Sequence, residues 1–108
     1  MPFPNSPNVR LKLIAVSQNK DKYDVLSSKD VIGIMRSLTR EEWKVSIETK
    51  IKIEIKVQVN AFSYQNEKFV QIENIYYRVE RTFVGGQFIE LYLSKTSLFV
   101  DDFIWPSI

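Results

Sequence analysis

One segment constrains the fold more than any other. From Trp43 to Ala61, apolar side chains occupy every odd position except Thr49. As a straight strand, at ~3.3 Å per residue, this segment would be roughly 60 Å long. A compact domain of about 100 residues has a radius of gyration of only ~13 Å. The segment therefore begins as a helix, bends at the corner of a barrel, or projects from the domain.

The start of this segment is compatible with a helix as well as with a strand. Thr39 and Glu42 have the spacing of a capping box, in which each side chain satisfies a backbone N–H at the start of a helix. A helix from Thr39 to about Ile47 would place Trp43 and Ile47 on one inner face, because residues four apart are neighbours on a helix. The sequence alone leaves helix and strand open for residues 39–47.

The rest of the chain consists of short segments that alternate apolar and polar residues. This pattern is typical of antiparallel strands with one buried face. Gly85-Gly86 predicts a hairpin turn, because glycine adopts positive φ without a steric penalty, and Gly33 would permit a close approach or a bulge. The predicted strands are 9–16, a return strand that starts at 23–26, then 31–37, 68–73, 75–83 and 87–94, with loops at 17–22 and 27–30.

These segments predict a mainly β protein. We expect a small antiparallel β-barrel of about six strands with one long strand or hairpin and, if residues 39–47 are helical, one short helix. The predicted organisation is an irregular N-terminal arm at 1–8, a single β-barrel domain at 9–97 and an apolar, acidic C-terminal tail at 98–108.

Composition excludes several kinds of chemistry. The 108 residues include no histidine and no cysteine, which removes an imidazole base, a thiolate nucleophile and a zinc–cysteine site. The acidic pairs Glu41-Glu42 and Asp101-Asp102 are adjacent in sequence, and neighbours point to different faces of a helix or strand. We therefore expect no enzyme activity, no metal site and no cofactor. The net charge of +2 does not indicate attraction of the whole molecule to nucleic acid, and no apolar run is long enough to span a membrane.

Two groups of side chains are candidates for binding surfaces. The first is a basic face, which is either the solvated side of a strand or a projecting arm that meets DNA phosphate. The second is an apolar group near the C-terminus, which covers the core, pairs as an edge strand or docks into a partner. The candidate DNA- or channel-facing residues are Lys44, Lys50, Lys52 and Lys56, and the candidate partner-docking residues are Phe99, Phe103, Ile104 and Trp105.

The aromatic residues between positions 62 and 83 admit two interpretations. Phe69, Tyr76 and Tyr77 would stack on bases in an OB-like module that binds single-stranded nucleic acid or oligosaccharide. The segment has as many acidic as basic residues and lacks the glycines of the RNA-recognition signature, so core and rim aromatics of a barrel fit it better. The residues expected on one face of the strand at 75–83 are Ile75, Tyr77, Val79 and Phe83.

Four elements, taken in order, resemble a known family. They are the run from Ser37 to Trp43 (SLTREEW) before the long alternating segment, and then 61–70 (AFSYQNEKFV), 75–83 (IYYRVERTF) and 88–93 (FIELYL). In this order and spacing the chain resembles the head-closure proteins of tailed phages and prophages, which are also called head–tail joining or stopper proteins. The resemblance covers roughly residues 11–94, and the C-terminal residues 98–108 have no counterpart in it.

The resemblance implies a fold, a role and a set of partners. Such proteins are small β-barrels that assemble, in twelve or six copies, into a ring under the portal protein and its adaptor. The ring closes the DNA-filled capsid and docks the tail through a tail completion protein. A loop or hairpin beside the long strand is expected to reach the packaged double-stranded DNA, a role that would lie between Trp43 and Lys56. The implied location is the neck of the virion, after synthesis in the cytoplasm of the bacterial host and without a membrane.

Overall fold

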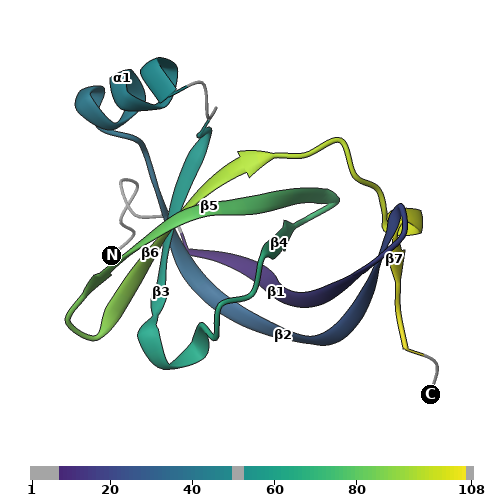
Figure 1. Ribbon diagram of the computed structural model, residues 1–108. Coiled ribbons are helices and arrows are strands. Elements are labelled where there is room, and N and C mark those ends of the chain that lie inside the picture. The colour runs from purple at the N-terminus through teal and green to yellow at the C-terminus, as the bar shows by residue number, and fades with distance from the viewer. Residues whose placement is uncertain (1–7, 50–52, 107–108) are drawn as a thin grey trace.

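Figure 1 shows the computed structural model, which describes residues 8–49 and 53–106 of the chain. In this part of the chain the helical elements are an α-helix, α1 (Arg40–Thr49), and two 3₁₀ turns, η1 (Ala61–Ser63) and η2 (Val100–Asp102). The strands are β1 (Asn8–Asn19), β2 (Lys22–Arg36), β3 (Ile55–Asn60), β4 (Phe69–Ile72), β5 (Ile75–Gly85), β6 (Phe88–Lys95) and β7 (Phe103–Ile104). The protein is mainly β, as the alternating segments predict.

The seven described strands form one sheet in the order β1-β4-β5-β6-β3-β2-β7. Because β1 also pairs with β2, the strands β1 to β6 close into a ring, and β7 pairs in parallel with β2. The ring is uneven: β1 pairs with β2 along its whole length, but with β4 only from Lys12 to Ile14. The predicted small antiparallel barrel is confirmed as an architecture, although its wall is not that of an even barrel.

β2 runs without a break through the stretch that was expected to be a loop, residues 27–30. The register between β1 and β2 shifts between Ala15, which faces Ser27, and Val16, which faces Val25. This β-bulge leaves Leu26 outside the ladder and exposed. Residues 27–30 are polar because this part of β2 is largely exposed, and not because the chain turns there. The predicted loop is wrong.

Two glycines have the roles that the sequence predicts. Gly86 has a φ of +68° in the hairpin between β5 and β6. Gly33 lies where β2 approaches β3 closely. A Cβ atom at Gly33 would lie 2.9 Å from both the Gln58 carbonyl oxygen and the Val59 Cγ1 atom. This contact leaves no space for a side chain at position 33.

The long alternating segment begins as the helix α1. The Thr39 N–H donates to Glu42 Oε1 over 2.8 Å, and the Glu42 N–H donates to Thr39 Oγ1 over 3.2 Å, which is the predicted capping box. Of the two alternatives for residues 39–47, the helix is confirmed. Trp43 does not lie on an inner face, because its side chain is 57% exposed. The excess length of the segment is thus taken up by a helix before β3 begins.

The core has two parts, which lie on opposite faces of β1 and β4, because neighbouring residues such as Leu13 and Ile14 belong to different parts. The first consists of inward-facing aliphatic residues of β1, β3, β4 and β6, and of these Leu13, Val57 and Leu91 are fully buried. The second contains Ile14, Val25, Phe69, Tyr76 and Phe103. Phe103 comes from β7, so the C-terminal segment contributes a core residue and is packed on the sheet.

Candidate functional site

The four lysines of the predicted basic face do not form one surface. Lys56 is only 6% exposed, and its Nζ lies 2.9 Å from Glu42 Oε1 and 3.1 Å from Glu42 Oε2. It therefore neither belongs to a solvated face nor is available to DNA phosphate. Lys44 is exposed on α1, whereas Lys50 and Lys52 lie outside the described residues. The alternation of the strand predicts that Lys56 lies on a polar, solvated face. Lys56 is buried because Glu42 on α1 contacts it, and the strand pattern does not predict a contact with a helix.

Lys56 is part of a cluster that joins α1 to β3 and β6, which we call the Glu42 cluster: Thr39, Glu42, Lys56 and Tyr92. The Tyr92 hydroxyl donates to Glu42 Oε2 over 2.6 Å. Burial by itself raises the pKa of the Glu42 carboxyl. Hydrogen bonds from the Thr39 N–H, the Tyr92 hydroxyl and the Lys56 ammonium outweigh that effect and lower its pKa to about 2.

The same cluster affects Tyr92. Burial raises the pKa of the Tyr92 hydroxyl, and the neighbouring Glu42 carboxylate adds to this, so that its pKa is about 12. The guanidinium of Arg81 lies 4.6 Å from the centre of the Tyr92 ring. Both pKa values lie far from neutral pH, so at that pH the carboxyl is ionised and the phenol is neutral, whereas a general acid or base works best with a pKa near the working pH. The contacts of the cluster join α1 to β3 and β6.

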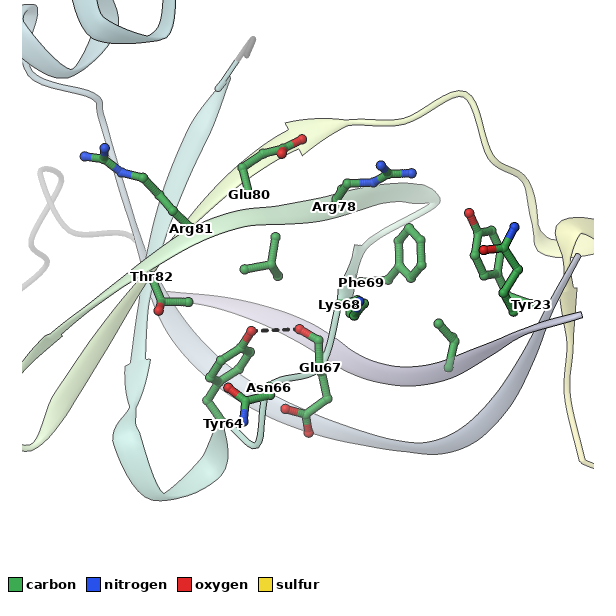
Figure 2. A pocket seen from close by; sticks show the side chains of 13 residues that line it. Tyr23, Tyr64, Asn66, Glu67, Lys68, Phe69, Arg78, Glu80, Arg81 and Thr82 are labelled. Carbon is green, nitrogen blue, oxygen red and sulfur yellow. Dashed lines mark hydrogen bonds between the residues drawn. The ribbon is translucent and has the colours of Figure 1, made fainter. Parts of the chain in front are cut away.

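A groove with a volume of about 550 Å³ runs along β5 (Figure 2). Tyr64 and Glu67 lie on one side of it, below β5, and Arg78, Glu80 and Arg81 extend from β5 on the other. The Tyr64 hydroxyl donates to the Glu67 carbonyl oxygen over 2.8 Å. Strand patterns do not predict this groove, because its other wall is the loop that leads into β4.

The two acidic side chains of the groove are already engaged. Glu67 is buried, accepts a hydrogen bond from the Gln65 N–H over 2.6 Å, and lies 3.4 Å from Lys29 Nζ. Glu80 accepts a hydrogen bond from the Ser94 hydroxyl. Burial and the Glu67 charge raise the pKa of Tyr64 to about 12. The groove thus offers polar contacts, and each of its two carboxylates is held by partners within the fold.

The C-terminal candidates divide into two groups. Phe103 is 4% exposed and stacks on Tyr76 with ring centroids 4.7 Å apart. Trp105 is half-buried and packs beside Phe103. Phe99 is 71% exposed, and Ile104 is exposed as well. Phe103 and Ile104 pair with β2 as a short strand. The core-covering interpretation therefore fits Phe103, and Phe99 and Ile104 remain accessible to a partner.

Exposed apolar residues gather in two groups at opposite ends of the sheet, and one of these groups includes Phe99 and Ile104 (Figure 1). η1 stays beside the β5–β6 hairpin because the Ala61 N–H donates to the Gln87 carbonyl oxygen over 2.8 Å. Exposed apolar residues at this end lie on η1 and on both faces of the β5–β6 hairpin, and together we call them the hairpin patch: Phe62, Phe83, Val84 and Phe88. The tail patch, at the end that carries β7, consists of Leu26, Phe99, Val100 and Ile104.

The sequence pattern assigned Phe83 to the wrong face of β5. The register between β5 and β6 shifts between Val79, which faces Leu93, and Arg81, which faces Tyr92. The extra residue at this bulge reverses the alternation, so Phe83 faces Glu90 and is 62% exposed. Phe83 therefore does not share a face with Ile75, Tyr77 and Val79.

The aromatic residues considered for base stacking are mostly unavailable. Phe69 and Tyr76 are buried in the second part of the core, and Tyr77 is half-buried. Stacking on a nucleic-acid base requires an accessible ring face. Core packing is thus the correct interpretation for Phe69 and Tyr76.

The described residues hold neither a cluster suited to a metal ion nor a helix that could cross a membrane. Within residues 8–49 and 53–106, no group of three or more acidic residues is placed to hold a metal ion. The helix in this part of the chain is too short and too polar to cross a membrane, and no other described helix qualifies. Comparisons with models of protein families, with curated proteins and with solved structures found no match.

Proposed function

We propose that the protein is a structural subunit of the phage head–tail connector. In this role it forms a ring under the portal or adaptor protein, closes the DNA-filled capsid and docks the tail. The observation that carries the proposal is that two groups of exposed apolar side chains, the hairpin patch and the tail patch, lie at opposite ends of the molecule. Apolar patches rimmed by polar residues mark interaction sites. Two different patches are what a subunit needs to contact two different neighbours in a ring.

The charge distribution is compatible with this role. The net charge is +2, so a single copy has little attraction for DNA, whereas a ring sums the charges of all its copies. Lys44 is the described lysine of the predicted basic face that remains exposed, and it lies on α1. α1 is held to the sheet by the Glu42 cluster, so that Trp43 and Lys44 are presented to the surroundings.

The proposal is tested by deleting the reading frame from the genome that encodes the protein and examining the lysate by electron microscopy. We expect separate heads and tails, with heads that have lost their DNA, and a return of tailed particles when the gene is supplied on a plasmid. A plasmid copy with an early frameshift is the control, because it supplies the DNA without the protein. Normal tailed, infectious particles from the deletion would contradict the proposal.

A further inference from the structure

A small hollow opens on the outer face of the hairpin patch. Phe83 and Phe88 both line it, and the other lining residues are Gln58, Gly85 and Glu90. Its volume is about 210 Å³. An apolar cavity of ~150 Å³ is large enough to bind benzene, so this hollow is large enough for a phenyl ring. Gly85 contributes to the opening because it has no side chain.

The tail patch presents a phenyl ring on a fixed backbone. The Phe99 N–H donates to Asp102 Oδ2 over 2.7 Å, and the Asp102 N–H donates to the Phe99 carbonyl oxygen over 2.9 Å. Lys22 Nζ donates to the Asp101 carbonyl oxygen over 2.8 Å, which ties η2 to the β1–β2 hairpin. The exposed ring of Phe99 is therefore held out by an ordered turn, and binding it costs little backbone entropy.

Each of the two features carries charges of both signs. At the hollow, Glu90 is a lining residue, and Arg36 Nη1 donates to Gln58 Oε1 over 3.3 Å, which places a guanidinium beside it. In the turn, Asp101 follows Phe99 by two residues and is exposed, and Lys22 Nζ donates to the Asp101 carbonyl oxygen. Asp101 can therefore meet Arg36 while Lys22 meets Glu90. A contact that inserts the ring into the hollow brings an exposed carboxylate toward an exposed guanidinium. Such complementarity favours one docking orientation over others.

We propose that Phe99 of one copy of this chain inserts between Phe83 and Phe88 of the next copy, with Asp101 facing Arg36. The inference rests on the proposed function in one respect, namely that the protein acts as a multimer. The hairpin patch and the tail patch lie at opposite ends of the sheet, so the contact is head-to-tail (Figure 1). Each copy then has one ring and one hollow to offer, and repetition of the contact closes a ring or builds a filament.

The first test exchanges the charges. D101R alone places an introduced arginine against Arg36, and R36D alone places an introduced aspartate against Asp101. Like charges then face each other in the contact, so each variant should associate about tenfold more weakly than the wild type. An equimolar mixture should recover wild-type association, because alternating copies match both contacts. Sedimentation velocity over a range of concentrations measures this. A wild type that stays monomeric at the highest concentration, or a mixture no better than its components, overturns the proposal.

The second test uses the absence of native cysteine. In a chain carrying both V100C and Q87C, which keeps the Phe99 ring and the hollow, oxidation should produce a ladder of dimers, trimers and higher species. Each single variant should stop at dimers. Val100 and Gln87 are both exposed, so the two substitutions fit the fold. A double variant that yields no species beyond the dimer argues against the head-to-tail contact.

Truncation of the ring provides the matched comparison. F99A should weaken association about tenfold. F62A removes an even more exposed phenylalanine of the hairpin patch that does not line the hollow, and it should leave association unchanged. Circular dichroism checks that both variants are folded. Equal effects of the two substitutions overturn the specific contact. Loss of tailed particles in the deletion strain would still support the connector role, so the two proposals fail separately.

Discussion

The Glu42 cluster gives the most quantitative prediction, because the pKa of its carboxyl falls from an ordinary 4.5 to about 2 on folding. A difference of about 2.5 pKa units, at ~1.36 kcal/mol for each unit, corresponds to about 3 kcal/mol of stability. The Glu42 side chain keeps 19% of its surface exposed, and solvent screening reduces this amount. We therefore expect the ionised carboxylate to stabilise the fold by about 2 kcal/mol near neutral pH.

The perturbation is E42Q, which keeps the size of the side chain and removes its charge. The variant leaves the buried Lys56 ammonium without its counter-charge, so its free energy of unfolding at pH 7 should be lower by about 2–3 kcal/mol. The folded-state pKa is depressed, so the stabilisation is fully present above pH 4.5 and is lost as the pH falls towards 2. The difference between wild type and variant should shrink over that interval.

Urea unfolding at several pH values between 7 and 2.5, followed by tryptophan fluorescence and circular dichroism, measures this difference. Acid also protonates the other carboxylates, but these are common to both proteins and cancel in the comparison. E41Q is the matched control, because Glu41 is the exposed neighbour on α1, and it should change stability by no more than about 0.5 kcal/mol. An E42Q protein as stable as wild type at pH 7, or a difference that does not depend on pH, would refute the reasoning.

Two further pairs of substitutions test the packing. F103A should lower the free energy of unfolding by about 3 kcal/mol, because it leaves a cavity beside the Tyr76 ring. I104A, on the exposed side of β7, should lower it by less than about 1 kcal/mol. Thermal unfolding compares the two variants. G33A should lower the free energy of unfolding by about 1–3 kcal/mol, since its Cβ would lie 2.9 Å from a backbone oxygen. G85A has space for its Cβ, so its free energy of unfolding should be nearly that of the wild type. Urea unfolding measures both variants. Equal effects within either pair would contradict the packing described.

Local sequence signals predict which helices and strands this fold contains better than they predict how far each strand runs and which face each residue takes. Alternation and turn residues correctly indicate a mainly β chain, the β5–β6 hairpin and the capped start of α1. The false loop at 27–30 and the wrong face of Phe83 have different causes. Residues 27–30 are polar because this part of β2 is largely exposed, whereas Phe83 follows a β-bulge, which adds one residue to β5 and shifts the alternation beyond it. A bulge has no strong sequence signature, so a pattern of period two is misread wherever one occurs.

The candidate surfaces were harder to predict because they depend on contacts between distant elements. Lys56 has the alternation of a solvated residue, and its burial follows from Glu42 on a helix fourteen residues earlier in the chain. Phe99 and Phe103 are equally apolar in sequence, but only Phe103 meets the rings of the core. The hollow beside Gly85 needs β3, β5 and β6 together. No single strand pattern contains that information.

The length of the segment from Trp43 to Ala61 requires that it begin as a helix, bend at the corner of a barrel or project from the domain. The first part of the segment forms the helix α1, which makes the segment shorter than an extended strand would be. The ion pair between Glu42 and Lys56 joins that helix to the sheet. Such a contact depends on an ionised carboxylate and is worth a few kcal/mol, less than the stability of a typical domain. Protonation of Glu42 at low pH removes this charge and so weakens the attachment of α1 to the sheet.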